Sequence, residues 1–214
     1  MAPPEWNFGH VAGVCDVGFI GTADAKVVTC GADNAVYVRN PASFEVEEAF
    51  TEEHTDMVNV LCIAPDGKKF VTGSDDTYVK LFNFEGSTRE FESNVTRFTL
   101  PVRALAYSND GTLLAAGGED SSVKVIDMKD KSVFLELQTR SKCVKSVAFD
   151  PKGEFLSAVD DAGSLTVWAL KAITKEGDEE EDKAVVEPGD SVMSATVAPV
   201  TTPDSPSTNG AKWR

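Results

Sequence analysis

The chain has 214 residues, of which 42% are hydrophobic and 26% are charged, and its formal net charge is −15. An acidic balance argues against direct nucleic-acid binding by bulk charge, because most of that affinity comes from neutralising phosphates with a basic face. The N-terminus, MAPPEWNFGH, has no signal-peptide pattern, and no apolar run approaches the roughly 18 residues of a membrane span, so we expect an intracellular protein without a membrane segment.

A unit of about 43 residues occurs four times along the chain. Each copy has an aliphatic residue that opens a β-rich run, and these residues are 43, 44 and 42 positions apart: Val36, Val79, Val123 and Leu165. A fixed period of about 40–45 residues with several strand-like runs per unit is typical of β-propeller blades. We therefore expect an all-β fold of about four blades, with units at residues 8–45, 46–95, 96–138 and 139–170.

The second unit shows the pattern best, over HTDMVNVLCIAPDGKKFVTGSDDTYVKLF. Its β-branched runs and turn residues predict strands at 58–63, 69–72, 78–82 and, more weakly, 88–91. The third unit repeats it as VRALAYSNDGTLLAAGGEDSSVKVID, in which Asn-Asp-Gly marks a hairpin. The fourth reads CVKSVAFDPKGEFLSAVDDAGSLTVW, and the first unit is the least regular.

The composition changes after Leu170, where an acidic run, EGDEEED, precedes a stretch rich in Ser, Thr, Pro and Ala. Such a segment has too few large apolar groups to offset the entropy of ordering it. We therefore expect residues 171–214 to be a mainly disordered tail. Because four blades are fewer than such a ring normally has, we also expect an open partial propeller with two unpaired edges.

Phrases such as PDGKKFVTGSDDTYVKLF and NDGTLLAAGGEDSSVKVID resemble the WD-repeat family. That resemblance implies a buried hydrogen-bond network formed by His54, Thr72 and Asp76, in which Phe82 stands where the family has Trp. A catalytic set of His, Thr and Asp is the alternative, but a nucleophile needs an exposed pocket and an oxyanion site. The structural interpretation is favoured, since buried polar groups must be paired.

The turns that precede the third strands each contain an Asp, for which we expect a structural role: Asp33, Asp76, Asp120 and Asp161. A short carboxylate can accept hydrogen bonds from the backbone N–H groups of a tight turn. The fourth unit has one additional residue between Asp161 and Leu165, which predicts a widened turn. Trp168 is expected to anchor the core or a contact between blades.

No further pattern indicates chemistry. The sequence contains no phosphate-binding loop and no paired catalytic carboxylates, so we predict neither an enzyme nor a cofactor. With His10 and His54 as the only histidines, no zinc-ligand spacing is present. The four cysteines are expected to be small buried hydrophobic residues in a reducing compartment: Cys15, Cys30, Cys62 and Cys143.

The order of three phrases is more specific: VVTCGADNAVYV, then VTRFTLPVRALAYSNDGTLLAAGGEDSSVKVIDM, then VKSVAFDPKGEFLSAVDDAGSLTVW. Over residues 8–168 it resembles the N-terminal propeller of the WD-repeat and HMG-box DNA-binding protein family, also known as the chromosome transmission fidelity factor family of yeasts. The resemblance implies a nuclear replication-fork adaptor that links helicase and polymerase alpha and supports sister-chromatid cohesion. After Trp168 the chain departs from that pattern, so the family's trimerisation region and HMG box are not expected in it.

The leading hypothesis is therefore a non-enzymatic nuclear interaction scaffold whose partners are replisome or chromatin proteins. Propellers bind partners on their faces and need no chemistry of their own. Two alternatives stay open at this point. One is a generic WD-repeat scaffold in ubiquitin ligation or trafficking, and the other is a truncated product with little activity.

Overall fold

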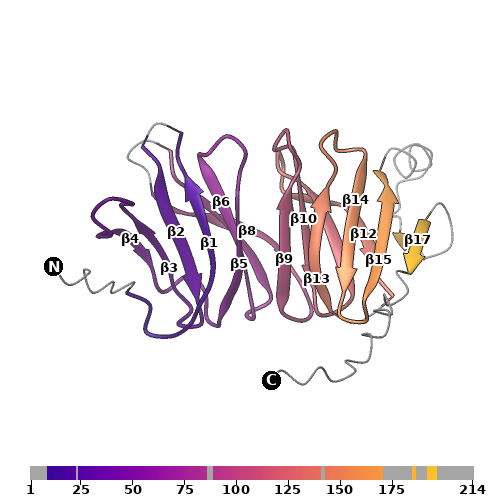
Figure 1. Ribbon diagram of the computed structural model, residues 1–214, viewed down its shortest axis with the longest axis horizontal. Coiled ribbons are helices and arrows are strands. Elements are labelled where there is room, and N and C mark those ends of the chain that lie inside the picture. Colours follow the sequence, from indigo (N-terminus) through magenta and orange to yellow (C-terminus); the bar gives the residue numbers. More distant parts are fainter. Residues whose placement is uncertain are drawn as a thin grey trace, which may run out of the picture.

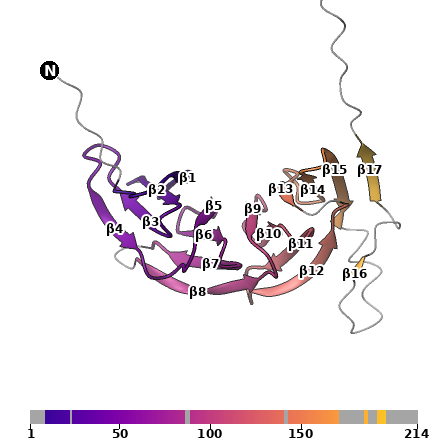
Figure 2. The ribbon, with the colours of Figure 1, turned by 90° about the horizontal axis from the view of Figure 1, so that it is seen from below.

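The computed structural model describes residues 9–22, 24–85, 89–140 and 143–170, together with the backbone of strands at 185–186 and 192–196. The described residues form four sheets that stand side by side in an arc, as Figure 1 and Figure 2 show. We call each sheet a blade. The all-β fold and the open partial propeller of about four blades are thus confirmed.

Each blade is an antiparallel meander in which consecutive strands are hydrogen-bonded neighbours. Blade one contains β1 (Val14–Ile20), β2 (Lys26–Gly31), β3 (Val36–Arg39) and β4 (Val46–Phe50). Blade two contains β5 (Val58–Ile63), β6 (Lys69–Ser74), β7 (Tyr78–Asn83) and β8 (Glu90–Arg97). Blade three contains β9 (Val102–Tyr107), β10 (Leu113–Gly118), β11 (Ser122–Asp127) and β12 (Ser132–Gln138). Blade four contains β13 (Val144–Phe149), β14 (Phe155–Asp160), β15 (Ser164–Ala169) and β17 (Val192–Thr196).

The outer strands differ most from the sequence-based expectation. The predicted second unit begins at residue 46, but β4 pairs with β3 and is the outer strand of blade one. The fourth strand of blade two runs from Glu90 to Arg97 instead of 88–91, and Thr88 lies outside the described residues. Two register shifts between β7 and β8 interrupt the alternation of that strand, which explains its weak sequence pattern.

The predicted tail, residues 171–214, lies mostly outside the described part of the chain. Two strands within it are described by their backbone. The strand β16 (Val185–Val186) pairs with β12 in parallel, and β17 pairs with β15 over five residue pairs from Ser164 to Trp168. The outer strand of blade four therefore comes from beyond Leu170, where no strand is predicted from the sequence.

The strands that begin each blade lie on the concave side of the arc, and β4, β8 and β12 lie on the convex side (Figure 2). Hydrophobic cores fill the spaces between blades. One core joins blades one and two through Val28, Phe50 and Phe70, and a second joins blades two and three through Val71 and Leu114. A third core, around Trp168, joins blades three and four. Each blade is thus held by its neighbours, as expected for a repeat architecture.

The turn between the second and third strands has the same geometry in all four blades. One residue of each turn has a positive φ, between 64° and 78°: Asn34, Thr77, Ser121 and Gly163. The hairpin registers of blades two and four also agree, since Gly73 pairs with Val79 as Val159 pairs with Leu165. The predicted widening of the fourth turn is therefore wrong. Asp161 stands at the position of Asp75, so no additional residue is present.

Candidate functional site

The residues predicted to form a network in blade two lie together. His54 precedes β5, Thr72 is on β6, and Asp76 is in the following turn. Nδ1 of His54 is 2.7 Å from Oδ2 of Asp76, and Nε2 is 2.7 Å from the hydroxyl oxygen of Thr72. Because an ionised carboxylate can only accept, Nδ1 of His54 carries a proton and donates to Asp76.

Asp76 is the centre of this network. Its Oδ2 also accepts from the backbone N–H of Thr55, and its Oδ1 accepts from that of Tyr78. Burial opposes ionisation of this carboxyl, but the hydrogen bonds from His54 and the two backbone groups outweigh it and lower its pKa to about 2. The Asp76 carboxylate thereby joins the segment that leads into the blade, at His54 and Thr55, to the turn that precedes the third strand.

Blade one contains a second network of the same kind. Nδ1 of His10 is 2.7 Å from Oδ1 of Asp33, and its Nε2 is 2.9 Å from the hydroxyl of Thr29. The sequence predicted the turn role of Asp33 but missed His10 and Thr29. Their signal was the spacing: His10 precedes Thr29 by 19 residues and His54 precedes Thr72 by 18. Because the first unit is irregular and has one additional residue between His10 and Thr29, their equivalence to His54 and Thr72 was not recognised from the sequence.

Blades three and four have no histidine at this place. In blade three the hydroxyl and N–H of Thr99 both donate to Oδ2 of Asp120, and Ser122 donates to Oδ1 at 2.5 Å. In blade four Asp160, not Asp161, accepts from the turn amides of Ala162 and Ser164. The backbone N–H of Asp161 donates to the carbonyl of Cys143. The predicted turn aspartates are therefore placed in turns, but with different partners in each blade.

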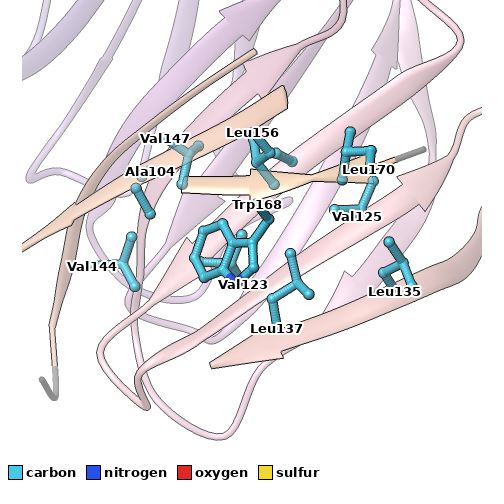
Figure 3. Close-up of a cluster of buried hydrophobic side chains, with 12 residues drawn as sticks. Ala104, Val123, Val125, Leu135, Leu137, Val144, Val147, Leu156, Trp168 and Leu170 are labelled. Atoms are coloured by element: carbon cyan, nitrogen blue, oxygen red, sulfur yellow. The ribbon is translucent and has the colours of Figure 1, made fainter. Parts of the chain in front are cut away.

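The residue at one equivalent position near the end of the third strand varies between blades: Arg39, Phe82, Ile126 and Trp168. Trp168 is 2% exposed and lies in a cluster with Val123, Leu137 and Val144, as Figure 3 shows. Arg39 is equally buried, and its Nε and Nη2 have no hydrogen-bond acceptor among the described residues. Burial lowers the pKa of its guanidinium group. Blade one thus contains a buried polar group with two unsatisfied donors where the other blades place an apolar side chain.

The polar networks are closed to substrates. Thr72 is fully buried and His54 is 3% exposed, so neither can reach a bound molecule without local opening. Within the described residues, no group of His, Cys, Asp and Glu has the arrangement of a metal site. In the same part of the chain, no helix has the length and apolarity needed to cross a bilayer. Burial of these side chains and the hydrogen bonds between them are what a network that stabilises the fold requires.

The concave side presents a polar cluster that continues from blade two to blade three. Nδ2 of Asn59 donates to Asp75 at 2.7 Å and to the carbonyl of Val102 at 3.0 Å. Nε of Arg103 donates to Glu119 at 2.7 Å, and Nη1 lies 3.2 Å from Asp75. The Arg103 side chain is 26% exposed. We call Asn59, Asp75, Arg103 and Glu119 the rim cluster; it offers hydrogen-bonding groups of both charges to a partner.

A polar hollow of about 350 Å³ lies where blades one and two meet, lined by Lys26, Lys68, Phe84 and Arg89 among others. Its cations are paired within the fold. Lys26 and Arg89 both donate to Glu47 at 2.8 Å, which lowers the pKa of this carboxyl to about 2, and Lys68 donates to Glu85. The hollow therefore joins two blades, and the lysines and the arginine that line it are each paired with a carboxylate.

The expectation that all four cysteines are buried is wrong for one of them. Cys30 and Cys143 are buried and Cys62 is partly covered, but Cys15 is exposed on β1. Burial raises the pKa of the Cys30 and Cys62 thiols, which keeps both in the neutral form. The strand registers make Cys15 equivalent to Asn59, Arg103 and Lys145, which are also partly or fully exposed, so its exposure is a property of this position in the blade.

The comparison with protein families identifies the class of this protein. The model of the WD domain, G-beta repeat, matches residues 47–83, 89–127 and 132–169, which together make up more than half of the chain. The chain therefore belongs to the WD-repeat family. The first blade is not matched as a separate repeat, in agreement with its irregular sequence.

Among curated proteins the chain is similar to WD repeat and HMG-box DNA-binding protein 1. Identity is 30% over 177 residues with the protein of Xenopus laevis and 29% over 169 residues with that of Homo sapiens. These alignments cover 79% and 77% of this chain but 14% of either relative. Minichromosome loss protein 1 of Schizosaccharomyces pombe is 27% identical over 159 residues, which are 74% of this chain and 19% of that protein. The chain thus spans less than a fifth of the length of these relatives.

Proposed function

We propose that this protein is a non-enzymatic nuclear scaffold that binds replisome or chromatin proteins, such as those associated with the helicase and polymerase alpha. The observation that carries the proposal is the similarity to WD repeat and HMG-box DNA-binding protein 1, which extends over 79% of the chain. The name of the fission-yeast relative, Minichromosome loss protein 1, also refers to chromosomes and supports a nuclear location. The two names refer to DNA and to chromosomes, and the link to helicase and polymerase alpha is what the family resemblance of the sequence implies.

The geometry supports a binding role without chemistry. We propose that His54, Thr72 and Asp76 have a structural role, together with Asp33, Asp120, Asp161 and Trp168. The rim cluster is the part of the concave side where exposed charges of both signs lie within one continuous hydrogen-bonded group. Such a surface can bind a peptide that presents both acidic and basic side chains.

The proposal can be tested by capturing partners from nuclear extract with the immobilised full chain and quantifying them by mass spectrometry. We expect helicase or polymerase alpha subunits to be enriched, and Arg103→Ala to reduce that enrichment at least about tenfold. The matched control is Arg97→Ala, which removes an exposed arginine from the outer strand β8. Loss of binding in both variants, or in neither, would argue against the rim cluster as the contact surface.

A second candidate, a general WD-repeat scaffold in another complex, has one specific observation in its favour. Target of rapamycin complex subunit wat1 of Schizosaccharomyces pombe is 35% identical over 121 residues, a higher identity over a shorter span of 56% of this chain. Capture of such a complex without replisome or chromatin proteins would favour this candidate and overturn the first. Failure of the wild-type chain to enrich any of these proteins would count against both.

A further inference from the structure

Blade one exposes three apolar residues whose equivalents in the other blades are buried or partly buried. Val14, Val17 and Phe19 on β1 are 49%, 59% and 66% exposed. The strand registers make Val14 equivalent to Val58, Val102 and Val144, all fully buried. Val17 is likewise equivalent to Leu61 and Val147, which are 7% and 6% exposed. We call this side of a blade, directed toward the preceding blade, its incoming face.

Close packing against the preceding blade covers the incoming face at each internal junction. A Cβ atom at Gly73 of blade two would lie 2.6 Å from Cγ1 of Val102, and one at Gly117 of blade three would lie 2.5 Å from Cγ1 of Val144. The first valine of each blade therefore fills a space that the preceding blade leaves open. We call the side that receives it the outgoing face. Blade one has an incoming face that no described residue covers in this way.

Blade four exposes the other half of such a junction. On its outgoing face Phe155 is 46% exposed and Val159 is 38% exposed, with Ser146 and Ala148 of β13 beside them. The equivalents of Val159 in the preceding blades, Gly73 and Gly117, are buried. The two uncovered faces stand at opposite ends of the arc (Figure 2).

We propose that two copies of this chain associate head to tail, with blade four of each copy packed on blade one of the other, to close an eight-bladed ring. This goes beyond the proposed binding of nuclear proteins and does not depend on it. Every internal junction pairs an outgoing with an incoming face, and the described residues leave one of each uncovered. A two-fold axis satisfies both at once, and eight blades lie within the range of about four to eight that propellers adopt.

The proposed junction between two copies has room for a side chain at its central contact. Val159 of one copy would meet Val14 of the other, where blades two and three have glycine. Blade one already shows that a side chain fits there, because Cys30 occupies the same position and packs in the core that contains Val58. Replacing Val159 with Gly would recreate the junction of blades two and three, so we expect this variant to associate at least as tightly as the wild type.

The salt dependence of association provides an independent test of the proposed dimer. The named residues of both faces are uncharged, but each copy carries a net charge of −15, so two copies repel each other at long range. Added salt screens that repulsion and leaves apolar burial intact. Association should therefore strengthen between low and physiological ionic strength, whereas an association held by ion pairs would weaken.

The test measures mass by analytical ultracentrifugation across a wide concentration range. The monomer is 22.9 kDa, and we expect the wild type to reach twice that mass. Phe19→Asp and Val159→Asp should each weaken association about a hundredfold, because an effect of about tenfold per junction acts at two junctions. Phe134→Asp is the control, since Phe134 is 46% exposed but lies on the outer strand β12.

Mixing the two variants distinguishes this arrangement from a symmetric face-to-face dimer. Phe19→Asp keeps its blade-four face and Val159→Asp keeps its blade-one face, so a mixed pair has one intact junction. Both charges of the mixed pair enter the same junction, where the second costs less than the first because the first has already opened that junction. We therefore expect the mixture to dimerise more tightly than either variant alone. A wild type that stays monomeric, a mass above two copies, a dimer unaffected by both variants, or a mixture no tighter than its components would each overturn the proposal. Thermal unfolding of each variant verifies that the blades remain folded.

Discussion

Replacing Asp76 with Asn tests whether the polar network of blade two stabilises the fold in the way its geometry indicates. The wild-type carboxylate accepts from His54 and Thr55 through one oxygen and from Tyr78 through the other. An asparagine has nearly the same shape but only one acceptor oxygen and no charge. The variant therefore removes the ionic part of the network with little change in packing.

The pKa gives the size of the effect. Folding lowers the pKa of Asp76 from its ordinary 3.8 to about 2, and its side chain is 4% exposed. At about 1.4 kcal/mol per tenfold change in acidity, the ionised form contributes about 2 kcal/mol to the free energy of unfolding. Because the folded-state pKa is the lower one, this contribution is complete above about pH 5 and is lost as the pH falls toward 2.

Chemical denaturation followed by circular dichroism, at a single protein concentration, measures the difference. We expect Asp76→Asn to be about 2 kcal/mol less stable than the wild type at pH 7, and we expect this difference to shrink to less than about 1 kcal/mol at pH 2.5. Glu52→Gln, which removes one charge from an exposed side chain two residues before His54, controls for net charge. A stability gap that stays constant with pH would refute the reasoning, since it would come from packing and not from the ionised carboxylate.

Three further predictions concern the other blades. Replacing Arg39 with Met should raise the free energy of unfolding by about 1–2 kcal/mol, because it removes buried donors that lack an acceptor; a lower melting temperature would contradict this. Gly117→Ala should destabilise by about 1–3 kcal/mol through its clash with Val144, whereas Gly13→Ala, with open space around it, should be neutral in the same denaturation assay. Glu47→Gln should lower the free energy of unfolding by about 1 kcal/mol at pH 7 and by almost nothing at pH 2, because the contribution of this partly exposed carboxylate is lost when it is protonated. Equal losses of stability at both pH values would exclude that cause.

The inner three strands of each blade were predictable because their signals are local. Tight turns need residues such as Asn109-Asp110-Gly111, and the positive φ of the second turn recurs at one place in every unit. The spacing of His54, Thr72 and Asp76 likewise matches the network that the structure contains. Where the repeat is regular, the position in the unit determines both the strand and the partner.

The outer strands and the turn of blade four could not be fully predicted, because they depend on contacts between residues that are far apart in the sequence. The outer strand β4 follows a loop that begins at Asn40, and only its pairing with β3 assigns it to blade one. The strand β17 has its partner, β15, more than twenty residues earlier in the chain. Asp161 lies in its turn, but the sequence aligned it with Asp76, whereas the hairpin register places it at the position of Asp75, and Asp160 accepts the turn hydrogen bonds.

Because the blades are repeats, the exposure of a residue can be compared with that of its equivalents in the other blades. This comparison identifies the uncovered faces at the two ends of the arc. In a nearest-neighbour architecture, stability is the sum of blade terms and junction terms. An isolated arc of four blades has three junctions, and a closed ring of two arcs has eight, which is four for each chain. Ring closure therefore adds one junction per chain to the three that already hold the blades, and it covers Val14, Val17 and Phe19 without requiring any new type of contact. A chain that gains a third more of its junctions by pairing should be measurably more stable at high than at low protein concentration.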